Sequence, residues 1–253
     1  MSDAQGRNAA SRDWFRDWFG EEYLAIYPHR DEREAEAAVR LFLEAAPPPH
    51  AAPVLDLACG AGRHLRELLA AGVPALGLDL SLELLRQARE ASPGARLLRA
   101  DMRRLPLADG GLGGLTSFFT SFGYFATREE DAVVAGEMRR VLCTGGSFML
   151  DFLNARRVRA ELVPEDVNEV RGLRVRQSRE IRGDTVLKRI RIDAGPEDTA
   201  SREFQERVRL YEPDELERLL AARGLETTAK FGDYGGAPFA RDAPRLILAG
   251  RAT

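Results

Sequence analysis

The sequence predicts an α/β fold built on a doubly wound, mostly parallel sheet. Its central part alternates short apolar runs with stretches of helical periodicity, and this alternation is typical of βαβ units whose strands lie parallel. Three of the apolar runs end in an acidic residue, at Asp56, Asp79 and Asp101. The length of 253 residues and a hydrophobic fraction of 44% fit one globular domain that carries an insertion.

Each element can be placed from its local pattern. The apolar positions of residues 31–46 recur at helical spacing, and the stretch ends at three consecutive prolines. In the part that follows, strands are expected at 53–58, 73–78, 95–100, 112–119 and 146–152, and helices at 62–71, 81–91 and 128–142. Ser81 is expected to cap the helix that follows it. The pair Gly145-Gly146 is expected to form a turn before the strand at 146–152.

The C-terminal part predicts one more helix and two strands. An amphipathic helix at 213–223 is ended by Gly224, and apolar runs follow at 225–234 and 244–251. Before this helix, residues 167–211 alternate with a period of two and contain a turn at Gly183-Asp184. This pattern predicts a three-stranded antiparallel insertion.

The first apolar run leads directly into a loop of small residues. Gly60 and Gly62 supply backbone angles and a close approach that a side chain would prevent, so a nucleoside-sized ligand is expected there. A dinucleotide-binding turn would have a third glycine at the position of Leu65. The acids at the ends of the next two strands, Asp79 and Asp101, stand where further contacts to a nucleoside are expected.

The pattern Asp56-x-Ala58-x-Gly60-x-Gly62 resembles the first motif of the class I (Rossmann-like) S-adenosylmethionine (SAM) dependent methyltransferases of small-molecule type, with Ala58 replacing a glycine. The resemblance implies SAM as the cofactor and a seven-stranded sheet whose C-terminal strand is antiparallel. It also implies that Asp79 binds the ribose and that Asp101 and Met102 read the adenine. The expected cofactor-binding residues are Tyr23, Tyr27, Asp56, Ala58, Cys59, Gly60, Gly62, Arg63, Asp79, Leu80, Asp101, Met102 and Phe118.

The same resemblance divides the chain into three parts. Residues 1–50 are expected to form a helical, aromatic lid segment whose Tyr23 and Tyr27 contact the cofactor. Residues 51–165 and 212–253 would form the SAM-binding core. Residues 166–211 would form an antiparallel β lid over the acceptor pocket. Arg63 follows the glycine loop, where it can neutralise the methionine carboxylate of SAM or simply begin a helix.

Candidate catalytic residues lie beyond the fourth and fifth strands, because ligands of open α/β sheets bind outside the carboxyl ends of strands. Tyr124 and Asp151 are the candidates for polar contacts to a small-molecule acceptor that is methylated on N or O. A catalytic base is not assigned, since Asp151, Tyr124, Tyr234 or solvent could accept a proton. The cysteines and histidines do not form a cluster at metal-ligand spacing, so no metal is expected.

Three other functions remain open from the sequence: an RNA or other nucleic-acid methyltransferase, an NAD-dependent oxidoreductase and a non-catalytic SAM-binding protein. A formal net charge of −3 argues against a nucleic-acid partner. The insertion is rich in arginine, which indicates either a solvated face paired with acids or a site for an anionic acceptor. Without an apolar run long enough to span a membrane, the chain is expected to be cytoplasmic, as a monomer or a dimer.

Overall fold

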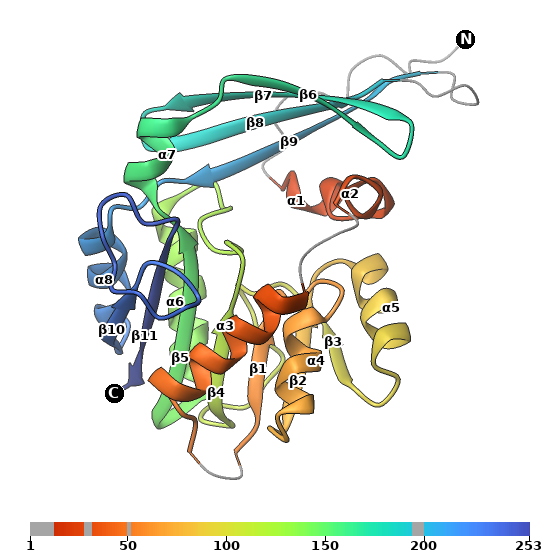
Figure 1. The fold of residues 1–253 in the computed structure, drawn as a ribbon. Coiled ribbons are helices and arrows are strands. Elements are labelled where there is room, and N and C mark those ends of the chain that lie inside the picture. The colour runs from red at the N-terminus through yellow and green to blue at the C-terminus, as the bar shows by residue number, and fades with distance from the viewer. Residues whose placement is uncertain (1–12, 28–31, 50–51, 194–199) are drawn as a thin grey trace.

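A computed structural model describes residues 13–27, 32–49, 52–193 and 200–253. The large sheet contains, in chain order, β1 (Val54–Leu57), β2 (Ala75–Asp79), β3 (Arg96–Arg99), β4 (Leu112–Ser117), β5 (Leu142–Leu153), β10 (Leu225–Phe231) and β11 (Arg245–Ala252). Their spatial order is β10-β11-β5-β4-β1-β2-β3 (Figure 1). The pairs from β5 to β3 are parallel, and β11 is antiparallel to both of its neighbours. The predicted seven-stranded, mostly parallel sheet is confirmed.

Helices cover both faces of this sheet. They are α3 (Glu32–Ala45), α4 (Arg63–Ala70), α5 (Leu82–Ala91), α6 (Arg128–Val141) and α8 (Pro213–Ala221). Successive strand residues point to opposite faces, so Val54 packs in the core under α3 and α4 while Leu55 packs in the core that contains α6 and α8. The hydroxyl of Ser81 accepts a hydrogen bond from Leu84 N–H, as the capping prediction requires. None of the described helices is long and apolar enough to cross a membrane.

Strand β5 begins earlier than the sequence predicts. Leu142 pairs with Leu112 and Ser147 pairs with Gly114, with a register shift between the two pairs. The glycines at 145 and 146 therefore lie in an irregularity within one continuous strand, and the expectation of a turn before the strand was wrong. A bulge of this kind keeps a strand in the sheet although extra residues oppose its partner.

The insertion holds four strands, so the prediction of three was wrong. After α7 (Ala155–Glu161) come β6 (Glu165–Val170), β7 (Leu173–Arg182), β8 (Thr185–Ile192) and β9 (Arg202–Arg209), paired antiparallel in that order. Strand β6 escapes sequence patterning because it is an edge strand with no fully buried residue. Hydrophobic alternation marks only strands that bury one face.

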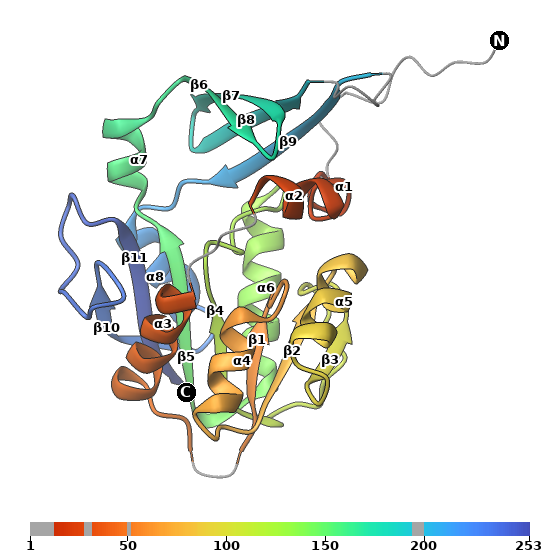
Figure 2. The same ribbon diagram turned by 45° about the vertical axis from the view of Figure 1, so that its right-hand side comes forward.

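The insertion forms a roof above the carboxyl ends of the large sheet (Figures 1 and 2). The short helices α1 (Phe15–Trp18) and α2 (Glu21–Ile26) lie between the roof and the core in both views. Trp18 packs against Phe204 of β9 with ring centroids 4.8 Å apart, and its indole N–H donates to Glu206 at 2.6 Å. The N-terminal segment is therefore attached to the roof.

A buried polar cluster joins the roof to the core at the end of β9. Arg209 Nε donates to Asp131 of α6 at 3.1 Å, and the Tyr211 hydroxyl donates to the same carboxylate oxygen at 2.8 Å. Arg209 also reaches Asp184, in the turn between β7 and β8, at 3.2 Å. Burial and the Asp131 charge raise the pKa of Tyr211 above its ordinary range, so the phenol keeps its proton and stays a donor.

Tyr211→Phe tests the contribution of this cluster to stability. The substitution removes one donor from a fully buried carboxylate, and we expect the free energy of unfolding to fall by about 1.5–3 kcal/mol. Urea unfolding measures the change. Thr228→Val is the control, because its hydroxyl bonds a neutral carbonyl at 3.4 Å and its loss should have a smaller effect. Equal losses in the two variants would contradict the assignment.

Candidate active site

Asp79, the acid that ends β2, binds the loop after β1 by a hydrogen bond. Gly60 N–H donates to one oxygen of Asp79 at 2.8 Å, and Ser81 N–H donates to the other at 2.8 Å. Ala58, Gly60 and Gly62 all have positive φ, at 57°, 55° and 79°. A Cβ on Gly62 would lie 3.0 Å from the Cβ of Ala88 in α5. Glycine at that position lets α4 begin close to α5.

Asp79 faces a large cavity at the carboxyl edge of the sheet. The cavity has a volume of about 1230 Å³ and extends from the loop after β1 to the inner face of the roof. Burial raises the pKa of Asp79 even though three backbone N–H groups oppose the shift. A buried carboxylate at a cavity wall favours ligand hydroxyls that can donate to it.

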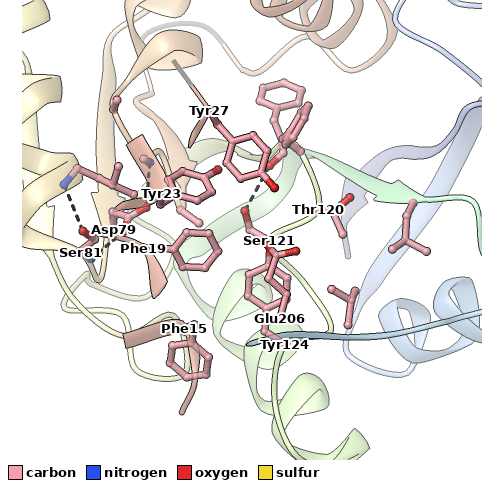
Figure 3. Close-up of a pocket in the computed structure, with 18 of the residues that line it drawn as sticks. Phe15, Phe19, Tyr23, Tyr27, Asp79, Ser81, Thr120, Ser121, Tyr124 and Glu206 are labelled. Atoms are coloured by element: carbon pink, nitrogen blue, oxygen red, sulfur yellow. Dashed lines mark hydrogen bonds between the residues drawn. The ribbon is translucent and has the colours of Figure 1, made fainter. Parts of the chain in front are cut away.

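The cavity brings together most of the residues predicted to bind the cofactor. Those that line it are Tyr23, Tyr27, Ala58, Cys59, Gly60, Arg63, Asp79, Leu80, Asp101, Met102 and Phe118. Asp56 and Gly62 do not line it and support the loop from behind. In Figure 3, Phe19, Tyr23 and Tyr27 lie between Asp79 on one side and Ser121 and Tyr124 on the other.

Asp56 is a buried acid beneath the loop. It is 1% exposed, it accepts a hydrogen bond from the Thr116 hydroxyl at 3.5 Å, and its Oδ2 atom has no partner within the described part of the chain. Burial, followed by the nearby charge of Asp79, raises the pKa of Asp56 to about 7. The side chain therefore changes charge near neutral pH.

Asp101 lies at the end of the cavity next to β3, and arginines surround it. Arg103 Nη2 donates to its carboxylate at 2.7 Å, and Arg16 approaches within 3.5 Å. Partial burial acts to raise the pKa of Asp101, but the hydrogen bonds from Arg103 outweigh it and hold the pKa below its ordinary value. Asp101 is therefore a charged acceptor at this end of the cavity.

The aromatic lid and the roof meet through a polar group inside the cavity. Lys188 of β8 donates to the Tyr27 hydroxyl at 2.5 Å, and its ammonium lies 3.4 Å from the Glu206 carboxylate. Tyr27 also packs against Tyr23 with ring centroids 5.3 Å apart. These contacts fix the ring of Tyr27 between the roof and the rest of the lid.

The sequence analysis missed the charged row on the inner face of the roof. Arg179, Lys188 and Glu206 are cross-strand neighbours, and Asp166 pairs with Arg179 at 2.6 Å. All four line the cavity. One signal could have identified Lys188: it is one of two lysines in a chain whose other 35 cationic residues are arginine.

Several other arginines of the insertion pair with acids on the exposed side. Arg182 and Arg189 contact Glu180 at 2.8 and 3.5 Å, and Arg191 contacts Glu203 at 3.6 Å. These pairs match the expectation of a solvated face. Exposed pairs of this kind contribute little to stability, and their charges are balanced locally.

Asp151 does not reach the cavity. Its carboxylate is fully buried and accepts hydrogen bonds from Arg245 at 2.5 and 2.8 Å, from Phe119 N–H at 2.6 Å and from the Tyr234 hydroxyl. Burial and the Asp151 charge raise the pKa of Tyr234 far above its ordinary range. Neither group is placed to take a proton from a ligand, whereas Tyr124 lines the cavity.

Arg63 contacts protein groups at the cavity wall. Its guanidinium pairs with Glu34 of α3 at 2.9 Å and lies over the Phe119 ring at 4.8 Å. These contacts give Arg63 a structural role in joining α4, α3 and the segment after β4. Among the described residues no group of three His, Cys, Asp or Glu side chains could hold a metal ion.

Comparison with known proteins agrees with this geometry. A family model described as a methyltransferase domain matches residues 54–146. The chain is 29% identical to a dTDP-3-amino-3,6-dideoxy-alpha-D-glucopyranose N,N-dimethyltransferase of Streptomyces fradiae, over 93% of this chain and 90% of that protein. Residues 54–146 are therefore a methyltransferase domain, and the fold and cofactor of the class I SAM-dependent methyltransferases, expected from the sequence, are confirmed.

Solved methyltransferase structures share the whole fold. A SAM-dependent methyltransferase from Clostridium acetobutylicum superposes with a TM-score of 0.78 at 18% identity, covering 91% of this chain and 98% of that one. DesVI of Streptomyces venezuelae superposes with a TM-score of 0.65 at 25% identity, covering 94% and 98%. The similarity therefore extends over nearly the whole length of both chains.

The raised pKa of Asp56 predicts a pH-dependent stability. Between its unfolded value of 3.8 and about 7, the folded methyltransferase binds a proton that the unfolded chain has released. Stability from this group is therefore lost as pH rises through 7, by about 4 kcal/mol at most. Asp56→Asn should remove this slope. Urea unfolding at pH 5 and pH 8 compares the two proteins.

Thr228→Val is the control for that measurement, because it removes a hydrogen-bonding side chain that carries no ionisable group. Its pH profile should run parallel to that of the wild type. A parallel profile for Asp56→Asn as well would contradict a raised pKa at Asp56, whatever constant change in stability accompanied it.

Ala58→Gly should stabilise the fold. Ala58 has φ 57°, which is sterically unfavourable for alanine and open to glycine. We expect a gain of about 0.5–1 kcal/mol in the free energy of unfolding, since the added chain entropy of glycine offsets part of the relief. The control is Ala61→Gly in the same loop, which is not among the positive-φ residues and should lose stability in urea unfolding.

Proposed function

We propose that the enzyme transfers a methyl group from SAM to a nitrogen atom of a small-molecule acceptor held beneath the roof. The full-length similarity to an amino-sugar N,N-dimethyltransferase supports a nitrogen acceptor. A cavity of about 1230 Å³ supports simultaneous binding of two molecules, because it exceeds the usual size of a pocket for one drug-sized ligand. This cavity, continuous from the Asp79 wall to the roof, is the observation on which the proposal rests.

The donor end is assigned to the edge formed by β1, β2 and β3. Asp79 is proposed to accept hydrogen bonds from the ribose hydroxyls, and Asp101 with Met102 to contact the adenine. The carboxylate of Asp79 fits this role, because it lines the cavity, burial raises its pKa, and ligand hydroxyls that donate to it would oppose that shift. Leu80, Cys59 and the Gly60 loop would enclose the nucleoside, and Tyr23 and Tyr27 would cover it.

When bound, SAM supplies a methyl group on a positively charged sulfur, and the reaction is a displacement by the lone pair of the acceptor nitrogen. The chain contributes alignment of the two molecules, which can account for about 7–11 kcal/mol in favourable intramolecular models. The aromatic lid excludes water, so the attacking nitrogen reaches the site without its hydration shell. Tyr124 lines the cavity and is proposed to contact the acceptor.

The roof is proposed to recognise a polar acceptor of balanced charge. Its inner row places Arg179 and Lys188 between Asp166 and Glu206, so each cation has an acid beside it. A sugar offers hydroxyls and an amine that such a row can bind. A nucleic-acid acceptor is disfavoured, because the outward arginines are balanced by acids and form no broad basic surface.

Three functional parts follow from these assignments. We propose residues 1–50 as a lid segment, of which the structure describes 13–27 beneath the roof and 32–49, where α3 packs on the sheet; 51–165 and 212–253 as the SAM-binding core; and 166–211 as the cover of the acceptor chamber. A cytoplasmic location is proposed with them, since the cytoplasm supplies SAM and small-molecule acceptors.

The substrate of the Streptomyces fradiae relative tests the acceptor class. Incubation of the enzyme with SAM and dTDP-3-amino-3,6-dideoxy-alpha-D-glucopyranose should yield a product heavier by one or two methyl groups on nitrogen, as measured by mass spectrometry with fragmentation. A panel of other amino sugars and their hydroxyl analogues extends the test. Methylation of the hydroxyl analogues with the amines unmodified would contradict a nitrogen acceptor.

Asp79→Ala tests the donor site. The loss of charge-assisted hydrogen bonds to the ribose should weaken SAM binding by about 1–3 kcal/mol in calorimetry. The variant also loses the hydrogen bond from Gly60 N–H to Asp79, which holds the loop, and this loss weakens binding further. The control is Asp109→Ala, which removes a strongly exposed carboxylate outside the cavity. Unchanged affinity in the Asp79 variant would contradict the proposed SAM site.

A further inference from the structure

The segment after β4 contains two consecutive residues with left-handed backbone angles, and neither is glycine. Phe119 has φ 60° and Thr120 has φ 59°. Such angles are sterically unfavourable for a non-glycine residue and persist only where surrounding contacts hold them. Thr120 is also β-branched, which makes the conformation less favourable still. Strong contacts must therefore fix this segment.

Asp151 of β5 provides those contacts. Its carboxylate accepts Phe119 N–H at 2.6 Å, and its main-chain carbonyl accepts Thr120 N–H at 3.1 Å. Arg245 of β11 binds both oxygens of that carboxylate and also donates to the Thr120 hydroxyl at 3.0 Å. The buried ion pair thus holds the main chain of Phe119 and the side chain of Thr120, while the main-chain carbonyl of Asp151 holds the N–H of Thr120.

The Phe119 ring adds a second restraint. The guanidinium of Arg245 lies 5.2 Å from its centroid and that of Arg63 lies 4.8 Å from it. Contacts between a guanidinium and an aromatic ring are favourable. Because Arg63 begins α4, directly after the glycine loop, the segment after β4 is tied to the loop proposed to bind SAM.

The order of the sheet places this segment beside the reacting part of the cofactor, and this step rests on the proposed function. The proposed adenine and ribose contacts lie at the ends of β3 and β2, and the next strands in the sheet are β1 and β4. A cofactor laid across these ends brings its sulfur and methionine to the β1 and β4 positions. Residues 118–121, which follow β4, all line the cavity.

We propose that Asp151 is a positioning residue, which with Arg245 holds Phe119 and Thr120 in left-handed conformations so that the main chain of residues 118–121 packs against the methyl-bearing sulfonium. Main-chain carbonyl groups carry partial negative charge and make weak contacts with polarised C–H groups. The segment then distinguishes SAM from S-adenosylhomocysteine (SAH), which lacks both the methyl group and the positive charge. Asp151 takes no proton in this arrangement.

Calorimetric titration with SAM and with SAH tests the proposal without an acceptor. Asp151→Asn keeps the size of the side chain and weakens the hold on Phe119 N–H. We expect its affinity for SAM to fall by about tenfold and its affinity for SAH by less than about threefold. Equal losses for the two ligands, or no loss, would overturn the proposal.

A pair of double variants separates backbone positioning from charge. Asp151→Asn leaves Arg245 without its counter-charge, which alone could repel a sulfonium. Asp151→Asn combined with Thr120→Gly, and the same change combined with Thr120→Ala, have identical charges and lack the same hydroxyl. Only glycine adopts a positive φ without strain. The glycine version relieves the strain at position 120 and leaves that at Phe119, so it should recover part of the SAM affinity, and failure to recover more than the alanine version would overturn the proposal.

Two further proteins complete the experiment. Thr120→Ala alone keeps the buried ion pair, so it gives a result even if Asp151→Asn does not fold; it should lower SAM affinity by about two- to fivefold with SAH unchanged. Arg251→Gln is the matched control, since Arg251 bonds loop carbonyls at the opposite end of β11. It should change neither affinity. A wild-type enzyme that bound neither ligand would contradict the proposed function, whereas equal losses in the variants contradict only the positioning role.

Discussion

Burial of carboxylates at the carboxyl edge of the sheet is the constraint on which the site depends. Three neighbouring or near-neighbouring strands, β1, β2 and β5, carry Asp56, Asp79 and Asp151 into an environment that is poor in water. An ionised carboxylate in such an environment must find donors or a cation, or else bind a proton. The structure contains all three outcomes side by side, and each gives the acid a different role.

Asp79 is stabilised by backbone N–H groups and so shapes the loop that faces the cavity. Asp151 is stabilised by Arg245, and this ion pair fixes the segment after β4. Asp56 has neither kind of partner for one of its oxygens, and burial raises its pKa to about 7. Similar positions at one sheet edge therefore produce an acid that faces the cavity, an acid in a buried ion pair and an acid that can become neutral.

The sequence predicted the core well because buried strands and helices there have apolar residues at regular spacing. Alternating apolar runs and amphipathic helices located β1 to β4 and the helices between them to within a few residues. The glycine loop and the acids at strand ends located most of one wall of the cavity. Backbone geometry requires particular residues at these positions, so single residues of the sequence indicate where the loop and the strand ends lie.

The fourth strand and the charged row of the roof, and the role of Asp151, could not be predicted from the sequence, for different reasons. Strand β6 is exposed and shows no hydrophobic alternation. Arg179, Lys188 and Glu206 become neighbours only through cross-strand pairing, which the pattern of one strand does not specify. Asp151 was expected to contact the acceptor because it ends an apolar run, but whether such an acid faces the cavity depends on a partner, Arg245, that lies on β11. Pairing between residues far apart in the sequence determined the charged row of the roof and the position of Asp151.

The order of the lid depends on the roof. Helices α1 and α2 have four and six residues and no side-chain caps, and isolated helices this short are unstable in water. Their order must come from contacts with other elements, and β8 and β9 provide several: Trp18 with Glu206 and Phe204, and Tyr27 with Lys188. The same residues, Lys188 and Glu206, also face the cavity. A molecule bound beneath the roof, as proposed, would contact the groups that hold α1 and α2 in place, so its binding and the order of these helices would be energetically linked.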